Sequence, residues 1–188
     1  MDRDDFTDGE LAALALAGRQ EAFAELMRRH REPIFRLVRG YVGDADDALD
    51  LVQECFTSAY LNLDRYDQSR PARPWLSRIA INKCRDRARR RAVRRLLLGD
   101  AAQAKAAADV PDPAPQPSDT VADREELEVL WTAIAALPAS LKEPLVLRTI
   151  EGLSQAETAE VLGISEKAVE TRLYRARSKL AAYRSAGE

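Results

Sequence analysis

The sequence predicts an all-α protein: two small helical domains joined by a flexible linker rich in Pro and Ala, with a helix-turn-helix in the C-terminal domain. Apolar residues recur at helical spacing through most of the 188 residues, and no strand-like alternation bounded by turn residues occurs. The segment VPDPAPQP places Pro at every second position from 111 to 117. Pro lacks an amide N–H and disfavours helix at the residue before it, so this segment indicates an extended tether. The alternative is an ordered surface loop within one domain.

The expected boundaries follow from this change in composition. The first domain covers residues 9–96, the linker residues 97–120 and the second domain residues 121–184. The second domain is near the lower end of the usual size range, which suits a compact helical module without a deep substrate cavity.

Four helices are expected in the first domain. An apolar stripe over residues 11–27 predicts one helix, and Pro33 is expected to begin the next. The turn GDAD at residues 43–46 offers an Asp cap to a third helix. Pro74 suits the first turn of a fourth, which extends to near Arg95.

The second domain begins with an amphipathic helix near Val121 that Pro138 stops. Ser140 is expected to cap a second helix, which ends at Gly152. Ser154 with a Glu three residues later is a capping box for a third helix.

The third helix and the last one form the helix-turn-helix. Gly163 permits the left-handed conformation of a tight turn, and Ser165 is the expected N-cap of the last helix. Helical spacing assigns one set of apolar residues to its inward face: Val169, Leu173, Ala176 and Leu180. The outward face and its flanks then present Lys167, Glu170, Thr171, Arg172, Tyr174, Arg175, Arg177 and Lys179. Such a helix suits the major groove of DNA, whereas the alternative is a helical hairpin with a solvated basic face.

Charge is segregated along the chain, although the formal net charge is only −2. Residues 1–64 hold 7 Arg against 14 Asp and Glu, a net of −7, and residues 65–95 hold 12 Lys and Arg against 2 Asp, a net of +10. Residues 96–165 hold 4 basic against 12 acidic residues, a net of −8, and residues 166–188 hold 6 against 3, a net of +3. Such blocks indicate surfaces of opposite sign for different partners.

Two segments of the first domain carry these charges on one helical side. In the basic segment, residues at steps of 4, 3 and 4 combine guanidinium groups with one amide: Arg78, Asn82, Arg85 and Arg89. This pattern suits a track of phosphates with some base contact, and the alternative is a solvated face without specificity. The acidic segment DALDLVQE directs four polar residues outward: Asp47, Asp50, Gln53 and Glu54.

The sequence offers no residues for catalysis, a metal or a cofactor. It has no Gly-rich phosphate loop, no GxSxG turn and no His/Cys cluster, so we expect no enzyme, no cofactor and no metal site. Cys55 and Cys84 stand alone and are expected to be buried thiols without a redox role. No apolar run is long enough to span a bilayer and the N-terminus is acidic, so we expect a cytoplasmic protein without a membrane segment.

Three segments in fixed order resemble one family. DALDLVQE, WLSRIAINKCRDRARRR and LSQAETAEVLGISEKAVETRLYRARSKL, with the Pro-rich tether before the last, make the chain similar to a bacterial sigma factor of the extracytoplasmic-function (ECF) group of the sigma-70 family. The resemblance extends over roughly residues 9–182. It implies that residues 9–96 are sigma domain two and residues 121–184 are sigma domain four.

The resemblance also implies partners and their contacts. Members bind the β and β′ subunits of core RNA polymerase and direct it to promoter DNA, and an anti-sigma factor commonly holds them inactive. Four residues would contact polymerase: Asp47, Asp50, Gln53 and Glu54. Residues of the loop 64–73 and the helix after it would capture and open the minus-10 element: Arg73, Arg78, Asn82, Arg85 and Arg89. Residues of the last helix would read the minus-35 element: Ser165, Lys167, Glu170, Thr171, Arg172, Tyr174, Arg175 and Arg177.

Glu170 stands where the family commonly has Lys or Arg. A carboxylate accepts from cytosine N4, so we predict a changed minus-35 preference. Two other classes remain as alternatives: a stand-alone helix-turn-helix transcriptional regulator, which would need a sensor or phosphoacceptor region, and a helical adaptor without DNA dependence.

Overall fold

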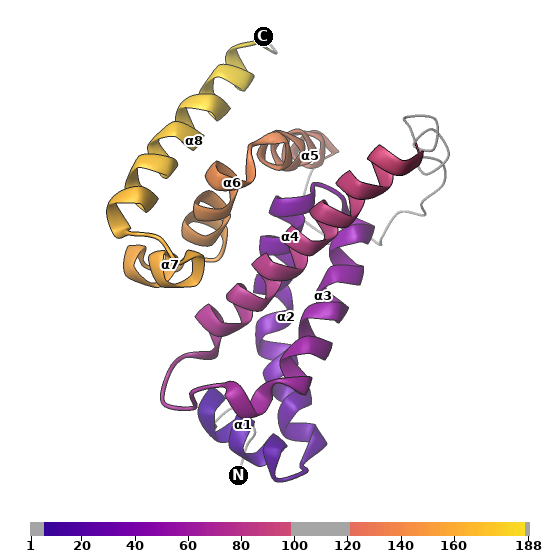
Figure 1. Ribbon diagram of the computed structural model, residues 1–188, viewed down its shortest axis with the longest axis vertical. Coiled ribbons are helices and arrows are strands. Elements are labelled where there is room, and N and C mark those ends of the chain that lie inside the picture. The colour runs from indigo at the N-terminus through magenta and orange to yellow at the C-terminus, as the bar shows by residue number, and fades with distance from the viewer. Residues whose placement is uncertain (1–5, 99–120, 187–188) are drawn as a thin grey trace.

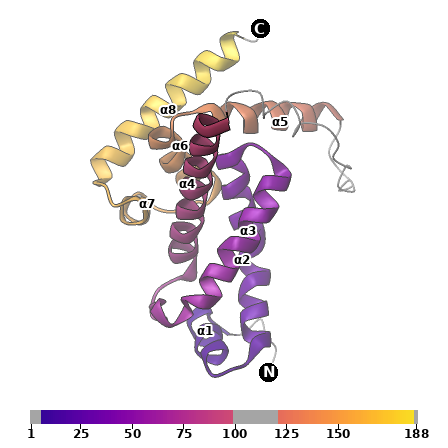
Figure 2. The same cartoon turned by 45° about the vertical axis from the view of Figure 1, so that its right-hand side comes forward.

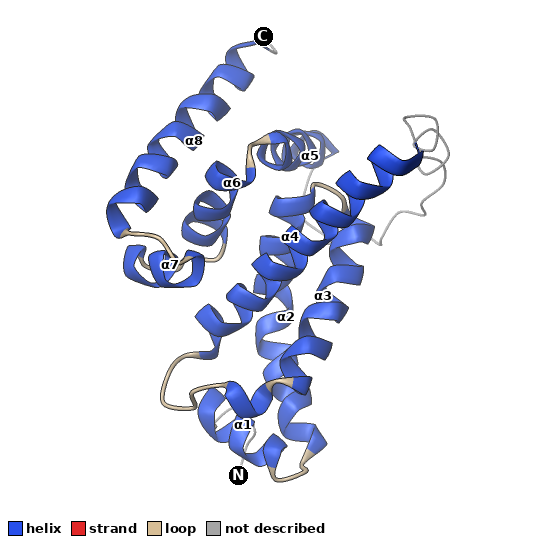
Figure 3. Ribbon diagram, viewed as in Figure 1, coloured by secondary structure: helices blue, strands red, loops and turns tan. Residues whose placement is uncertain are grey.

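The computed structural model describes residues 6–98 and 121–186, and both stretches are built from helices joined by loops, without a strand in either (Figure 3). The all-α prediction is therefore confirmed. Of the predicted flexible linker, residues 99–120 lie outside the described residues. None of the described helices is long and apolar enough to cross a membrane.

The first unit consists of α1 (Asp8–Leu16), α2 (Gln20–Val42), α3 (Ala45–Leu61), the short 3-10 helix η2 (Leu63–Arg65) and α4 (Ala72–Leu98). The three long helices α2, α3 and α4 lie side by side and α1 packs at one end of them (Figure 1). Their shared core is formed by large side chains that are almost fully buried: Leu26, Leu37, Leu51, Leu76 and Ile81.

The predicted boundary at Pro33 is wrong. The break between the first two helices lies at residues 17–19, where Gly18 adopts a φ of 91°, and Pro33 lies inside α2. A proline in a helix interior removes one backbone hydrogen bond, and α2 continues through it because one side of the helix stays buried in the core on both sides of that position.

The starts of α3 and α4 agree with the sequence. The carboxylate of Asp44 accepts a hydrogen bond from the amide of Asp47 at 2.8 Å, which is the expected Asp cap. Pro74 is the third residue of α4, in its first turn, where its missing N–H has no intrahelical partner to lose.

The second unit consists of α5 (Val121–Ala136), α6 (Ala139–Leu145) with its π-helical continuation η4 (Val146–Ile150), α7 (Gln155–Leu162) and α8 (Glu166–Ala186). The predicted cap at Ser140 is wrong, because the N-cap is Pro138 and Ser140 lies in the first turn of α6. The carbonyl of Pro138 accepts from the amides of Leu141 and Lys142 at 2.9 and 3.0 Å, which starts the helix ahead of the serine.

The helix-turn-helix forms as predicted. Ser154 and Glu157 make both bonds of the capping box of α7, and Gly163 ends this helix with a φ of 68°. The hydroxyl of Ser165 accepts from the amide of Ala168 at 3.2 Å and so caps α8. The inward side of α8 packs into the core of the unit through Val169, Leu173 and Ala176, with Leu180 half-buried.

The two units pack against each other, which the sequence did not predict. α5 and η4 contact α2, and α7 lies beside α4, so that the second unit covers one side of the first (Figures 1 and 2). Figure 1 shows α8 set apart from the long helices of the first unit, against α6 and α7.

Candidate functional site

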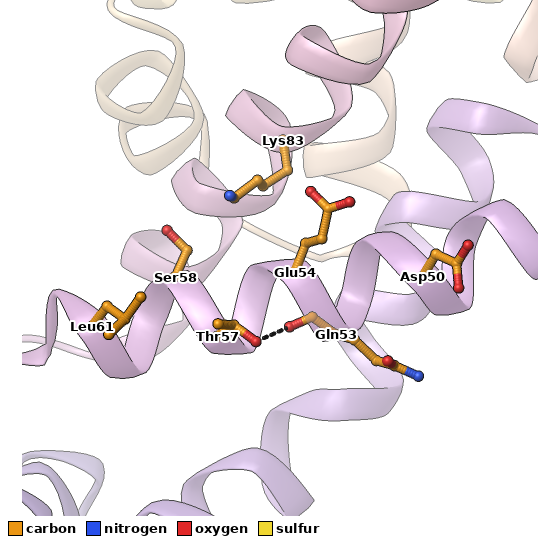
Figure 4. Close-up of a pocket in the computed structure, with 7 residues that line it drawn as sticks. All are labelled: Asp50, Gln53, Glu54, Thr57, Ser58, Leu61 and Lys83. Carbon is orange, nitrogen blue, oxygen red and sulfur yellow. Dashed lines mark hydrogen bonds between the residues drawn. The ribbon is translucent and has the colours of Figure 1, made fainter.

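The acidic face of α3 is open. Asp50 and Gln53 are exposed and Glu54 is half-buried, and these three line a shallow recess with Leu61 and with Lys83 of α4 (Figure 4). The recess brings carboxylate, amide and ammonium groups into one patch beside the side chain of Leu61. A protein surface with basic side chains would complement the outer part of this face.

Asp47 differs from its three predicted companions. Its carboxylate accepts from Arg87 at 2.5 Å and from Arg91, and its side chain is only 15% exposed. The structure therefore turns Asp47 toward α4 and leaves Asp50 and Gln53 facing outward, while the half-buried Glu54 is directed toward Lys83 of α4 (Figure 4).

The predicted basic side of α4 is real, and much of it faces the second unit. Arg85 makes a bidentate pair with Glu143, in which Nε and Nη2 donate to Oε1 and Oε2 at 2.7 and 2.6 Å. Nε of Arg73 donates to Oε1 of Glu151 at 2.9 Å. Thus two guanidinium groups predicted to face DNA are bound to carboxylates far away in the sequence.

The other three predicted residues on α4 have different surroundings. Nη2 of Arg78 donates to the backbone carbonyl of Glu160 at 2.9 Å. Asn82 is exposed, and Arg89 is exposed and pairs with Asp86 on its own helix. The structure therefore brings Arg73, Arg78 and Arg85 to the contact between the units and leaves Asn82 and Arg89 outside it.

The loop before α4 forms a small recess beside these arginines. The rings of Tyr66 and Trp75 stack with centroids 4.9 Å apart, and burial raises the pKa of the Tyr66 hydroxyl to about 12. This hydroxyl donates to the carbonyl of Arg70. The recess is lined by residues of both units: Arg65, Tyr66, Asp67, Arg70, Pro71, Pro74, Trp75 and Arg78 from the first, and Glu157 and Glu160 from the second.

Sequence reasoning missed Arg70 and the three glutamates of the second unit. The guanidinium of Arg70 binds Glu160 through two bonds, Nη1 to Oε1 at 2.8 Å and Nη2 to Oε2 at 2.5 Å. The available signal was the charge segregation, because a block of −8 follows a block of +10. That signal indicates opposite surfaces, but it does not tell which carboxylate meets which guanidinium.

The glutamates at this contact differ in electrostatic setting. Glu151 is fully buried, and burial raises the pKa of its carboxyl above the usual value even though Arg73 acts to lower it. Its second oxygen, Oε2, has no hydrogen-bond partner among the described residues. Glu160 is exposed, and its hydrogen bonds with Arg70 lower its pKa.

The outward side of α8 carries the other predicted set. Most of these residues are exposed and Arg172 is half-buried, which confirms the predicted division of the helix into two sides. Tyr174 is 75% exposed. Nζ of Lys167 pairs with Oε2 of Glu170 at 2.8 Å, and the hydroxyl of Thr171 donates to the carbonyl of Lys167 at 2.9 Å.

The two cysteines are buried free thiols, as predicted. Burial raises the pKa of Cys55 to about 12 and raises the pKa of Cys84 as well. Since the thiolate is the reactive form, both thiols are protected from oxidation and alkylation in this fold.

Comparison with known families gives two matches. Residues 26–94 match the family described as Sigma-70 region 2, and residues 127–180 match the family described as Sigma-70, region 4. The first match lies in α2–α4 and the second in α5–α8.

Similarity to known proteins extends over nearly the whole chain. The RNA polymerase sigma factor CnrH of Cupriavidus metallidurans is 41% identical over 177 residues, which is 93% of each chain. The ECF RNA polymerase sigma factor SigM of Mycobacterium tuberculosis is 33% identical over 179 residues, 95% of this chain and 85% of that one.

Solved structures show the same fold. CnrH in complex with the cytosolic domain of CnrY superposes with a TM-score of 0.71 at 36% identity, over 96% of this chain and 99% of that one. The sigma factor RpoE of Bartonella quintana, in complex with the anti-sigma factor NepR, superposes with a TM-score of 0.67 at 20% identity, over 84% and 93%. The latter likeness is one of fold alone.

Proposed function

This chain belongs to the sigma-70 family, in its extracytoplasmic-function group, and we propose that its two units perform different tasks in promoter-specific initiation. A sigma factor binds core RNA polymerase and directs it to promoters. Residues 9–96 act as sigma domain two and residues 121–184 as sigma domain four. The single observation that carries this proposal is the presence of both family segments, in this order, on two separate helical units.

The acidic face of α3 is the docking surface for polymerase. Asp50 and Gln53 face outward there, and the half-buried Glu54 lies between them and Lys83 in the same patch. Asp47 lies behind the patch, where its carboxylate forms ion pairs with Arg87 and Arg91 of α4. Asp47 therefore contributes less to the polymerase contact than the sequence predicted.

The loop 64–73 and α4 engage the minus-10 element. The guanidinium groups of Arg73, Arg78 and Arg85 neutralise phosphates, and Asn82 and Arg89 extend this track along the same helix. The recess beside Tyr66 and Trp75 offers an aromatic wall for a base turned out of the stack.

The outward side of α8 reads the minus-35 element in the major groove. Its exposed N-terminal half carries Lys167, Glu170 and Thr171, while Arg175 and Arg177 reach phosphates. Glu170 accepts a hydrogen bond from cytosine N4 once Lys167 exchanges it for a phosphate.

The remaining expectations belong to this proposal. The chain performs no catalysis of its own, needs no cofactor or metal, and works in the cytoplasm, where polymerase and promoters are. An anti-sigma factor controls it, since two sigma factors of this fold are captured with protein partners: CnrH with the cytosolic domain of CnrY, and RpoE with the anti-sigma factor NepR.

Reconstitution with core polymerase tests the proposal. Purified chain and core enzyme are incubated with a library of genomic fragments, and initiation sites are mapped from the transcripts. We expect initiation from fragments that share paired minus-35 and minus-10 elements, and loss of initiation in a variant with Ala at Asp50, Gln53 and Glu54. Absence of initiation together with absence of core binding refutes the proposal. DNA binding without any effect of polymerase would instead support a stand-alone regulator.

A further inference from the structure

The contact between the two units is closely packed around a glycine. A Cβ placed on Gly40 of α2 would lie 2.8 Å from Cδ1 of Ile150, 3.1 Å from a ring carbon of Trp131 and 3.2 Å from Cγ1 of Val146. These distances are below ordinary van der Waals contact. The side chains of η4 and α5 therefore rest directly on the backbone of α2, as in the interior of a protein.

A second glycine marks the same contact. Gly43 ends α2 with a φ of 82°, and a Cβ there would lie 2.6 Å from Cβ of Ala135. Nearby, Nζ of Lys142 donates to the carbonyl of Tyr41 at 2.9 Å, and Arg39 pairs with Glu128. Apolar packing and polar bonds thus hold the same region of α2 against the second unit.

Carboxylates of the second unit form ion pairs with arginines of α4 and of the loop before it. Glu143 binds Arg85 and is only 4% exposed, and the fully buried Glu151 binds Arg73. Further along, Glu160 binds Arg70 through its carboxylate, with 2.5 and 2.8 Å contacts. Three carboxylates therefore follow one basic surface at successive positions.

This arrangement resembles the binding of a phosphate backbone. A guanidinium that donates two hydrogen bonds to a carboxylate has the same geometry available for a phosphate, and it cannot serve both at once. The second unit also covers the approach to these groups, because α7 lies beside α4 and contributes Glu157 and Glu160 to the recess near Trp75. In this arrangement Arg73 and Arg85 already donate to carboxylates and Arg78 donates to the carbonyl of Glu160, so DNA must compete with the second unit for all three guanidinium groups.

We propose that the free chain rests in a closed form in which Glu143, Glu151 and Glu160 of the second unit take the place of DNA phosphates on the arginines of the first, so that minus-10 binding requires the units to separate. This inference rests on the proposed function for its biological meaning, whereas the closed form itself is a property of the free chain. Separation exposes the basic surface at the moment when DNA replaces the glutamates.

The other two proposed surfaces stay open in the closed form. Asp50 and Gln53 on α3 are exposed (Figure 4), and so are Tyr174 and Arg175 on α8. Polymerase therefore docks on the closed chain first, and the minus-10 surface becomes available afterwards. This order prevents the free chain from occupying melted DNA without polymerase.

The first test opens the contact without changing any charge. Gly40→Leu places a large side chain against Ile150, Trp131 and Val146, and Ala24→Leu, at an exposed site of the same helix, is the matched control. Solution scattering of the free full-length chain should give a compact wild type and an increase of roughly a quarter in the radius of gyration of Gly40→Leu. The control should match the wild type.

The same variants are then titrated with a fluorescent 20-nucleotide single-stranded DNA of mixed sequence. If the open form is about one tenth of the wild-type population, Gly40→Leu should bind about tenfold more tightly, because the apparent affinity scales with the competent fraction. Equal scattering and equal DNA affinity of wild type and Gly40→Leu would overturn the closed form.

A charge exchange decides the question if Gly40→Leu does not fold. Arg70 and Glu160 are 51% and 45% exposed, so their exchange disturbs neither core. Glu160→Arg should expand the chain in scattering, and the double variant Arg70→Glu with Glu160→Arg should restore the compact form. Expansion that persists in the double variant contradicts the proposal. Failure of initiation with core polymerase would refute the proposed function and leave these scattering results unchanged.

Discussion

The arginines of α4 and the outward side of α8 are both basic helical surfaces proposed to meet DNA, yet their surroundings differ. On α8 the exposed guanidinium of Arg175 and the ring of Tyr174 point to solvent. On α4 the guanidinium groups of Arg73 and Arg85 are bound to buried glutamates of the other unit. The surface of α8 is free to bind a ligand, whereas the arginines of α4 already bind carboxylates of the same chain.

This difference separates two properties that a charge pattern combines. Basic residues at helical spacing indicate which side of a helix attracts an anion. Whether that side is free depends on carboxylates elsewhere in the chain, because buried ion pairs form wherever the fold brings opposite charges into one water-poor contact. The same pattern therefore gives an open basic surface on α8 and a covered one on α4.

The largest difference should appear when one arginine from each surface is removed. Arg85→Ala leaves the Glu143 carboxylate buried without its guanidinium, so we expect the free energy of unfolding to fall by about 1–3 kcal/mol. The figure is below that of a fully buried pair because the Arg85 side chain is 38% exposed. Arg175→Ala, on the exposed surface, should change it by less than about 0.5 kcal/mol. Urea unfolding of the full chain measures both, and equal losses would show that the two surfaces do not differ.

On the open surface, specificity should change without a loss of stability. Glu170→Lys removes an acceptor for cytosine N4, so we expect the minus-35 preference at one position to shift by about 1–3 kcal/mol of discrimination. Selection from promoters with a randomised minus-35 element, transcribed by reconstituted polymerase, provides the measurement. Ala182→Lys also adds a lysine, in the last turns of α8, and should keep the original preference. An unchanged preferred sequence with Glu170→Lys would remove Glu170 from the reading residues.

A carboxylate within the first unit provides an internal reference. Asp47 holds Arg87 and Arg91 of α4 as the glutamates hold Arg73 and Arg85, but without any contribution from the second unit. Asp47→Asn should therefore leave solution scattering unchanged and weaken core polymerase binding less than Asp50→Asn, by a margin of about 0.5–1 kcal/mol. Binding is read by competition for core enzyme in solution. A stronger loss with Asp47→Asn would return this residue to the docking surface.

The smallest expected effect is a pH dependence of closure. Burial raises the pKa of Glu151 in the closed form above 4.5, against the lowering influence of Arg73, His30 and Arg36, and separation returns this carboxyl to water. Its contribution to closure is thus fully present below pH 4.5 and is lost as the pH rises through the raised value. Glu160, whose pKa is lowered by Arg70, acts in the opposite direction and only below pH 4.5. Scattering between pH 7.5 and 4.5 should show tighter closure on acidification, and Glu151→Gln should abolish its part of this trend. Looser closure of the wild type over that range would contradict the assignment.

Local features of the fold were predictable from the sequence where one segment determines them. The caps at Asp44, Ser154 and Ser165 and the turn at Gly163 depend on residues within one or two turns of each other. The position of Pro33 inside α2 was not predictable in this way, because tertiary burial on one side of the helix outweighs the local preference.

The same distinction applies to the site: features that one segment determines were predictable, and contacts between distant segments were not. Helical spacing correctly separated the inward residues of α8 from the outward ones. It could not reveal that Glu143 and Glu151 are buried, since a glutamate is usually solvated and only its distant arginine partner explains its burial. The partners of α4 are separated from it by 58 to 82 residues, beyond the reach of any periodic pattern.

The close contact at Gly40 of α2 limits which second units from related proteins can replace the second unit of this chain. Position 40 and the pair Ile150 and Trp131 share one fixed volume, so a larger residue on one side requires a smaller one on the other. A chimera that joins this first unit to a foreign second unit would inherit the promoter preferences of both parents. Its free form would be closed only if the foreign side chains fit against the backbone at Gly40. Exchange of units would therefore retain promoter recognition more readily than the closed form.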